Sequence, residues 1–224
     1  MNRGGSLFDT WSKFVLVKQF EVGSFSIFSY LVADEKAGEG LFIDPSAEHD
    51  MLVREAAAHS IKIKYIVNTH SHIDHSMGNR EMVRRTGAEV VIHEADAPGL
   101  LQTPRDILEM FGAESPPPAD ILVSDGQLIE VGSVALKVIH TPGHTPGGMC
   151  LYIDGMVFTG DTLFVGAIGR TDFPGGSYRQ LETSVRTKLY TLPGDTVVLP
   201  GHNYGSSPTS TIDRERRTNP YIRE

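Results

Sequence analysis

The sequence has few of the features that would support a disulfide, a membrane span or a nucleic-acid interface. Cys150 is its only cysteine, so no intramolecular disulfide can form. No apolar run is long enough to cross a bilayer, and the first residues, MNRGGSLFDTWSKF, lack the apolar core of a signal peptide. Basic side chains are outnumbered, with 20 Lys and Arg against 28 Asp and Glu and a formal net charge of −8, which argues against broad contacts with nucleic acid or a membrane surface. We therefore expect a cytoplasmic protein with neither a nucleic-acid nor a membrane partner; the sequence leaves its oligomeric state open.

The composition suits a protein with a substantial core. Hydrophobic residues make up 40% of the 224 positions, and this length is typical of one domain. We expect residues 1–224 to form a single domain, of which residues 1–13 could be a loose N-terminal extension. Cys150 lies in the apolar run MCLYI without an electropositive neighbour in sequence, so a buried and unreactive thiol is expected there.

Short strands and helices alternate along the chain. Apolar patterning predicts strands over 14–20, 26–33, 40–44, 64–68 and 88–93, and a helix that follows THSHIDH and ends near residue 86, where Gly87 fits a C-terminal cap. After a proline-rich middle, strands are predicted at 127–131, 134–140, 148–154, 156–160 and 196–200, and helices over 178–192 and 209–219. Many short strands in each half, with helices between them, favour two sheets that pack face to face under helical layers.

Metal-capable side chains are crowded directly after the apolar run KYIVN. His70, His72, Asp74 and His75 all fall within the segment THSHIDH. Residues two apart in an extended segment point to the same side, so His70 and His72 can face one ion, and Asp74 and His75 in the next turn can face a neighbouring point. Neutral imidazole suits zinc or iron, and a carboxylate adds charge and can bridge two ions.

Three later strand ends supply similar groups. VIHTPGHTPGG carries His140 and His144, MVFTGDTLF carries Asp161, and TVVLPGHNYG carries His202. Rigid strands can aim such groups at one point. We interpret His140 as a structural histidine, and we expect the remaining histidines on the surface or in loops, namely His49, His59 and His93.

These motifs together resemble those of the metallo-β-lactamase superfamily. THSHIDH resembles its HxHxDH signature, and HTPGHTPGG, FTGDTLF and LPGH follow in the family's order, so that the resemblance runs from about residue 14 to the end. It implies an α/β fold, a four-layer αββα sandwich, with a metal site along one edge of the β layers. Carried over by position, it implies a first metal on His70, His72 and His144, a second on Asp74, His75 and His202, and Asp161 as the bridge between them.

The implied metal centre suits hydrolysis of thioesters, lactams, lactones or phosphoesters, among which the fold alone does not choose. Two divalent ions, with zinc as our first choice and iron or manganese as alternatives, would share a water and lower its pKa towards neutrality. The metal-bound hydroxide would then attack a carbonyl whose oxyanion the metals stabilise. A thiolate leaving group needs little help from an acid. Asp74 and Asp161 are our candidate catalytic residues in this scheme.

Two branches of the superfamily compete for the chain. HTPGHTPGG and GDTLF are typical of the glyoxalase II group, the hydroxyacylglutathione hydrolases, although only about twenty residues follow His202, and we expect no helical C-terminal domain for glutathione. GAIGRTDFPGGS and ERRTNP are similar to the compact single-domain hydrolases of this group. GRTDF and the tail HNYGSSPTSTIDRERRTNP also resemble the persulfide dioxygenases, which share the whole ligand motif but would use a single Fe(II), here on His70, His144 and Asp161. We favour a single-domain glyoxalase II-like hydrolase of a small-molecule thioester such as an S-acylglutathione, with oxidation of glutathione persulfide as the alternative.

Several residues near the predicted centre are candidates for supporting roles. Arg170, Asn203 and Tyr204 could contact substrate, although Arg170 could instead pair with Asp172. Asp44, at the end of an apolar strand, could orient a histidine ligand or form a turn. Residues 100–118 could cover the pocket, with an apolar wall supplied by Met110 and Phe111.

Overall fold

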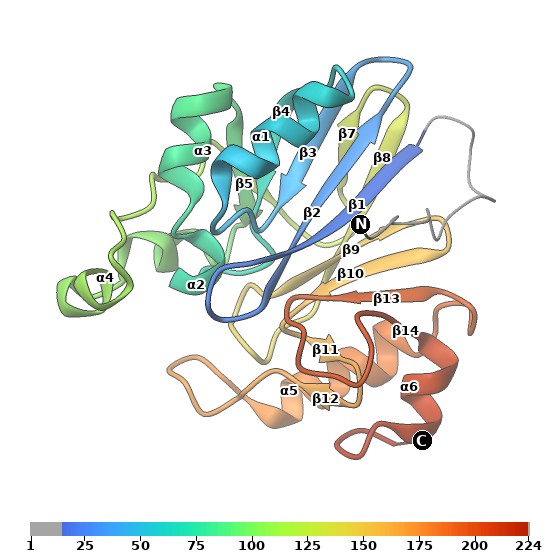
Figure 1. Ribbon diagram of the computed structural model, residues 1–224. Helices are drawn as coiled ribbons and strands as arrows, with labels where there is room; N and C mark the ends of the chain where they lie inside the picture. The colour runs from blue at the N-terminus through green and yellow to red at the C-terminus, as the bar shows by residue number, and fades with distance from the viewer. Residues whose placement is uncertain (1–14, 224) are drawn as a thin grey trace.

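Two six-stranded sheets face each other in the computed structural model, which describes residues 15–223 (Figure 1). The first sheet is built from the N-terminal half. Its opening strands form antiparallel pairs and its later strands are parallel, because helices make the crossovers. The order is β1 (Val15–Val22), β2 (Ile27–Asp34), β3 (Glu39–Ile43), β4 (Lys62–Val67), β5 (Glu89–His93) and β6 (Ile121–Val123).

The second sheet is built from the C-terminal half. Its order is β14 (Ser210–Thr211), β13 (Val197–Pro200), β10 (Met156–Gly160), β9 (Met149–Ile153), β8 (Val134–His140) and β7 (Leu128–Val131). The β8–β9 and β9–β10 pairs are antiparallel and the β10–β13 pair is parallel. It follows that β8, β10 and β13 all run in the same direction and end at the same edge of the sheet. A small separate hairpin pairs β11 (Leu163–Phe164) with β12 (Ala167–Ile168).

Helices cover the outer face of each sheet (Figure 1). One apolar cluster joins the first sheet to α1 (His49–Ala58) and α3 (Asn79–Thr86). Another joins the second sheet to the π-helical turn η2 (Val185–Leu189), which continues α5 (Tyr178–Ser184), and to α6 (Ile212–Thr218). The predicted αββα sandwich is thereby confirmed. Within the described residues, no helix combines the length and the apolar character that a membrane crossing requires.

Alternate side chains of β2 point to opposite faces of the first sheet, so this strand contributes to two apolar clusters. Phe28 and Tyr30 point into the cluster between the sheets, whereas Ile27 and Leu31 point into the cluster under the helices. In the inner cluster, the rings of Tyr30 and Phe158 meet edge to face with centroids 4.9 Å apart. Burying an aromatic side chain of this kind contributes about 1.5–3 kcal/mol, so the contact ties the first sheet firmly to the second.

Two local expectations are changed by the structure. The helix predicted after THSHIDH is α3, which begins only at Asn79, and a separate short helix, α2 (Ile73–Ser76), lies within the motif itself. Between them the chain at Gly78 passes so close to Pro45 that a Cβ there would lie 2.0 Å from the Pro45 carbonyl oxygen. Strands β6, β11, β12 and β14 were not predicted, since each has only two or three residues. Gly87, at φ 69°, ends α3 as predicted, and the predicted extension at residues 1–13 lies outside the described residues.

Two shorter helices lie between β5 and β6. These are the 3₁₀ helix η1 (Ala97–Leu101) and α4 (Arg105–Phe111). α4 stands out from the two sheets on the side of α2 (Figure 1). None of its residues is buried.

Candidate metal centre

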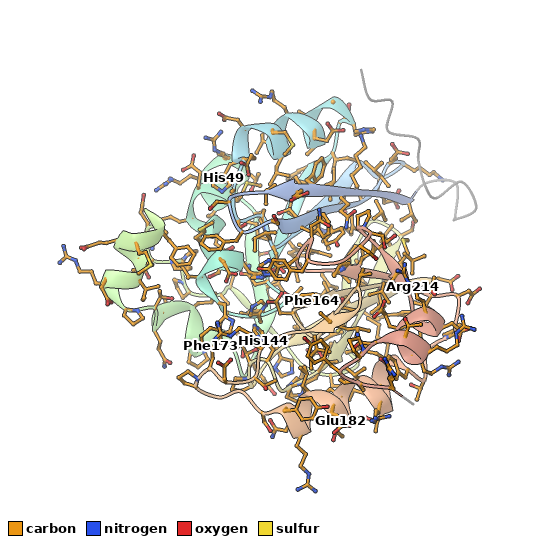
Figure 2. All side chains as sticks on the ribbon, turned by 60° about the horizontal axis from the view of Figure 1, so that its bottom comes forward. His49, His144, Phe164, Phe173, Glu182 and Arg214 are labelled. Atoms are coloured by element: carbon orange, nitrogen blue, oxygen red, sulfur yellow. The ribbon has the colours of Figure 1, made fainter. Side chains whose placement is uncertain are left out.

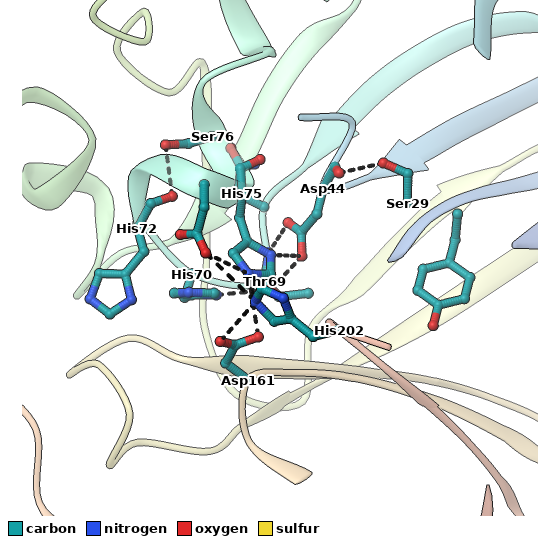
Figure 3. A network of polar contacts seen from close by, with 12 residues as sticks. Ser29, Asp44, Thr69, His70, His72, His75, Ser76, Asp161 and His202 are labelled. Atoms are coloured by element: carbon teal, nitrogen blue, oxygen red, sulfur yellow. Dashed lines mark hydrogen bonds and ion pairs between the residues drawn. The ribbon is translucent and has the colours of Figure 1, made fainter. Parts of the chain in front are cut away.

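The segments that follow four strands bring the predicted ligands to one place. Figure 3 shows His70, His72, His75, Asp161 and His202 gathered there. The chain leaves β4 through His70 and His72 and enters α2, which carries Asp74 and His75. In the second sheet, the shared direction of β8, β10 and β13 brings the segments that follow them to a common edge. These segments carry the remaining predicted ligands, which are His144, Asp161 and His202.

The donor atoms form three compact groups, each with its atoms within 4.8 Å of one another. They are His70, His72 and His144; Asp74, His75 and His202; and His70, His75 and Asp161. Asp161 lies between the first two groups, because its Oδ2 is 3.5 Å from His144 Nε2 and 3.4 Å from His202 Nε2. The structure therefore brings together all seven side chains that the sequence singled out.

The inner atoms of this cluster lack ordinary hydrogen-bond partners. Among the described residues, His70 Nε2 and Asp161 Oδ1 are buried and have no hydrogen-bond partner, although Asp161 Oδ1 lies 3.3 Å from His75 Nε2. His72 Nδ1 faces His144 Nε2 at 2.9 Å, and His75 Nε2 faces His202 Nε2 at 3.1 Å. Buried polar atoms are normally satisfied. Because the Nδ1 atoms of His144 and His202 face carbonyl oxygens, which only accept, these atoms carry the ring protons, and each neutral ring directs an Nε2 lone pair at the centre. A nitrogen-rich set with carboxylates fits a divalent cation such as zinc or iron.

Oxygen atoms around the cluster orient most of its histidine rings. Each Nδ1 of four histidines contacts an oxygen, which turns the Nε2 atom towards the centre. The contacts are His70 with Thr69 Oγ1 at 3.1 Å, His75 with Asp44 Oδ2 at 3.0 Å, His144 with the Arg170 carbonyl at 2.7 Å, and His202 with the Phe25 carbonyl at 2.9 Å. His72 is the exception, since its Nδ1 itself faces the cluster.

Asp44 has the supporting position considered from the sequence. Its carboxylate accepts hydrogen bonds from the Thr69 amide at 2.9 Å and the Thr69 hydroxyl at 2.6 Å, besides its contact with His75. Its backbone φ of 47° is unusual for a residue other than glycine. Such strain persists only where surrounding contacts over-determine it, as these three contacts do.

Burial and charge set the protonation of the cluster. Burial, followed by the neighbouring His75, holds the pKa of His70 well below its usual range. Burial and His144 lower the pKa of His72 to about 4. For Asp161, burial acts to raise the pKa, but the charges of His75 and His202 bring it well below the usual range. At neutral pH, His70 and His72 therefore offer neutral imidazole lone pairs beside the ionised carboxylate of Asp161, the forms that bind metal. His75 differs, because burial acts to lower its pKa but the charges of Asp161 and Asp74 outweigh this effect and hold the pKa well above the usual range, so a bound metal would replace a proton there.

The family model of the metallo-beta-lactamase superfamily matches residues 22–202. The chain belongs to the metallo-beta-lactamase superfamily. It is 35% identical to human mitochondrial persulfide dioxygenase ETHE1 over 98% of this chain and 79% of that protein. It is 33% identical to the hydroxyacylglutathione hydrolase GloC of Haemophilus influenzae over 84% of this chain and 89% of that protein. The chain is therefore an enzyme-family member with relatives in both of the competing branches.

Two solved structures share the fold of this chain. ETHE1 from Myxococcus xanthus superimposes with a TM-score of 0.79 at 32% identity, covering 92% of this chain and 83% of that chain. TTHA1623, solved in a di-iron-bound form, superimposes with a TM-score of 0.80 at 30% identity, covering 92% of this chain and all of that chain. Together with the donor groups, these relatives support a divalent metal at the centre and leave its identity open.

Asp96 supports the metal centre, and no pattern in the sequence indicated this role. Its buried carboxylate accepts hydrogen bonds from the Ser71 amide at 2.8 Å and the Gly147 amide at 2.6 Å. Ser71 lies between His70 and His72, and Gly147 follows His144 by three positions. Asp96 thus ties together the two loops that carry the first donor group. Its short side chain lies in a loop between β5 and η1, where no local pattern marks it.

The predicted substrate-contacting residues differ in their positions. Arg170 and Tyr204 line the cavity beside the centre, and Tyr204 stacks on His202 with ring centroids 4.4 Å apart. Arg170 also pairs with Asp172 at 2.7 Å. Asn203 donates from its side-chain amide to Glu21 at 2.9 Å and is not one of the residues that line the cavity. Their roles towards substrate stay predictions.

The exposure of individual side chains tests the remaining predictions about single residues. Cys150 is fully buried, as predicted. Phe111 lines the cavity as expected, whereas Met110 is 75% exposed and does not line it, because it lies on the other side of α4. The prediction that His93 lies on the surface is wrong. Its ring ends β5 at 3% exposure and stacks on His140 with centroids 4.0 Å apart.

Proposed function

We propose that the protein is a metal-dependent hydrolase that cleaves a small-molecule thioester, in the manner of the glyoxalase II group. The observation that carries this proposal is the complete second donor group. Asp74, His75 and His202 converge within 4.8 Å, and Asp44 and the Phe25 carbonyl orient the two histidines of that group. A single ion on the first group would not need these residues, whereas a pair of ions would use all of them.

The side chains have distinct tasks in this proposal. Divalent ions, with zinc as first choice, would lower the pKa of a bound water and polarise the thioester carbonyl. Asp161 contributes negative charge between the two histidine sets, with its Oδ1 3.3 Å from His75 Nε2. Asp74 lies at the cavity, with 23% of its side chain exposed and its Oδ2 3.6 Å from His202 Nε2. It can therefore accept a proton from the attacking water.

A second candidate function is oxidation of a persulfide with one iron on His70, His144 and Asp161. The match to human persulfide dioxygenase over 98% of this chain favours it. Both functions would use these three residues, so they do not favour either one. The two functions differ at the second donor group, which would hold a metal ion in the hydrolase and none in the dioxygenase.

The test uses the protein purified aerobically, with metal content measured per chain. Thioester hydrolysis is compared with oxygen uptake on glutathione persulfide. For a hydrolase we expect two metals per chain and hydrolysis that falls at least a hundredfold in His202→Ala, with one metal lost. The matched control is His59→Ala, a partly exposed histidine that caps α1. One iron per chain with oxygen uptake, and no thioester cleavage, would assign the second function instead.

A further inference from the structure

A cavity of about 930 Å³ opens directly beside the metal centre. Its inner end is lined by metal-capable residues, including His72, His144 and Asp161. Figure 2 shows His144, Phe173 and Phe164 in the same region of the molecule. The greater part of the wall is apolar and includes Phe25, Ile73, Ile107, Phe111, Phe164 and Phe173. A molecule that places its carbonyl at the centre therefore lays its body against hydrocarbon.

The charged groups of the cavity do not suit an anionic body. Among the described residues that line it, Arg170 is the only lysine or arginine. Its guanidinium already donates to both oxygens of Asp172, at 2.9 and 2.7 Å, and lies 4.2 Å from the centre of the Phe173 ring. Of the carboxylates that line the cavity, Asp74 and Asp161 belong to the metal centre, where bound cations would offset their charge, so they offer no partner to the rest of a substrate. Glutathione carries a net negative charge and would find little compensation for its desolvated carboxylates here.

The outer wall is formed by aromatic contact between distant segments. Phe25, in the turn between β1 and β2, stacks on Phe111 of α4 with centroids 5.0 Å apart. The carbonyl of the same Phe25 accepts from His202 Nδ1 at 2.9 Å. Ile107 and Phe111 turn one side of α4 to the cavity. The apolar wall is therefore continuous from the metal centre to α4.

We propose that this site selects thioesters by an apolar acyl group, a linear chain of medium length, and not by a glutathione moiety. The inference rests on the proposed hydrolase function and names its substrate class. Burial of each methylene against the wall contributes about 0.8 kcal/mol, which corresponds to about fourfold in kcat/KM. Preference should therefore rise with chain length until the wall is filled.

The test compares acetyl, butyryl, hexanoyl and octanoyl thioesters of N-acetylcysteamine with the metal-loaded protein. We expect kcat/KM to rise by about threefold to fourfold per methylene, and the octanoyl ester to be cleaved faster than the same ester of glutathione. Flat rates along the series, or rates more than tenfold higher for the glutathione esters, would overturn the inference and leave the hydrolase standing. If no thioester is cleaved, the hydrolase and this inference fall together.

Variants of α4 test whether the wall is responsible. Phe111→Ala and Ile107→Ala should each lower the octanoyl-to-acetyl ratio of kcat/KM by about tenfold. Met110→Ala, on the exposed side of the same helix, is the matched control and should leave the ratio unchanged. Calorimetry should also show that the S-octyl thioether of N-acetylcysteamine binds more weakly to Phe111→Ala and Ile107→Ala than to the wild type. An unchanged ratio in both wall variants, with melting temperatures like that of the wild type, would remove α4 from the proposal.

Discussion

The Oδ2 atom of Asp44 lies 3.0 Å from the Nδ1 atom of His75, although the two residues are separated by 31 positions in the chain. The opposite nitrogen of the same ring, Nε2, faces His202 Nε2 at 3.1 Å. One carboxylate at the end of β3 therefore sets the direction of a ligand on α2 (Figure 3). This arrangement makes the second donor group depend on a residue that does not belong to it.

We predict that Asp44→Asn weakens metal binding at the second donor group by about 10–100-fold. An amide nitrogen in place of Oδ2 would meet two groups that now donate to that oxygen, the His75 ring and the Thr69 hydroxyl. Competition with a chelator of known affinity measures the change. Asp154→Asn, in the exposed turn after β9, is the control. Equal affinities in the two variants would show that Asp44 does not position the ligand.

Asp96 should matter for the first donor group in the same way. In Asp96→Ala the amides of Ser71 and Gly147 lose their common acceptor, so the free energy of unfolding should fall by about 1–3 kcal/mol. Metal affinity at His70, His72 and His144 should fall as well, because their loops are no longer tied. Asp96→Asn keeps the size and one acceptor oxygen and should retain more metal than Asp96→Ala. A loss of stability with unchanged metal affinity would contradict the positioning role.

Asp34 should make stability depend on pH in the acid range. Hydrogen bonds from the Ser133 hydroxyl, the Ser133 amide and the Ala37 amide lower the pKa of this carboxyl from about 3.8 to about 2. Because the pKa is depressed in the folded state, the stabilisation is fully present above the unfolded value near 4 and is lost as the pH falls through about 2. Asp34→Asn should therefore cost about 1–2 kcal/mol at neutral pH.

Urea unfolding at a series of pH values measures this effect. The difference between the wild type and Asp34→Asn should be constant above about pH 5 and should shrink as the pH is lowered from about 4 to about 2. A difference that does not change over this range would show that the carboxylate charge is not what ties β2 to the turn between β7 and β8.

Cys150 should not react in the folded protein. Burial raises the pKa of its thiol to about 11, with the Thr141 and Thr162 hydroxyls offsetting part of the effect, and the side chain is fully buried. An aromatic disulfide reagent at about pH 8 should label almost none of the native chains and one thiol per chain in concentrated guanidinium, since only an accessible thiolate attacks. Rapid labelling of the native protein would contradict this environment.

The sequence by itself determined the ligand types, their order and the fold. His70 and His72 share a side because extended residues alternate, and apolar strands of four to eight residues with helices between them predict layered sheets. The resemblance of THSHIDH, HTPGHTPGG, FTGDTLF and LPGH to one superfamily placed all seven candidate ligands. These conclusions depend on local geometry and on motifs, which a linear chain records directly.

Only the tertiary structure decided how the ligands are held and what borders them. Asp44, Asp96 and the Phe25 carbonyl contact the ligand-bearing segments from positions far away in sequence. Phe25 and Phe111 meet although 86 positions separate them, whereas Met110, next to Phe111, points to solvent. Hydrogen bonds and ring contacts act over a few ångströms, and the packing of two sheets determines which distant atoms come within that range.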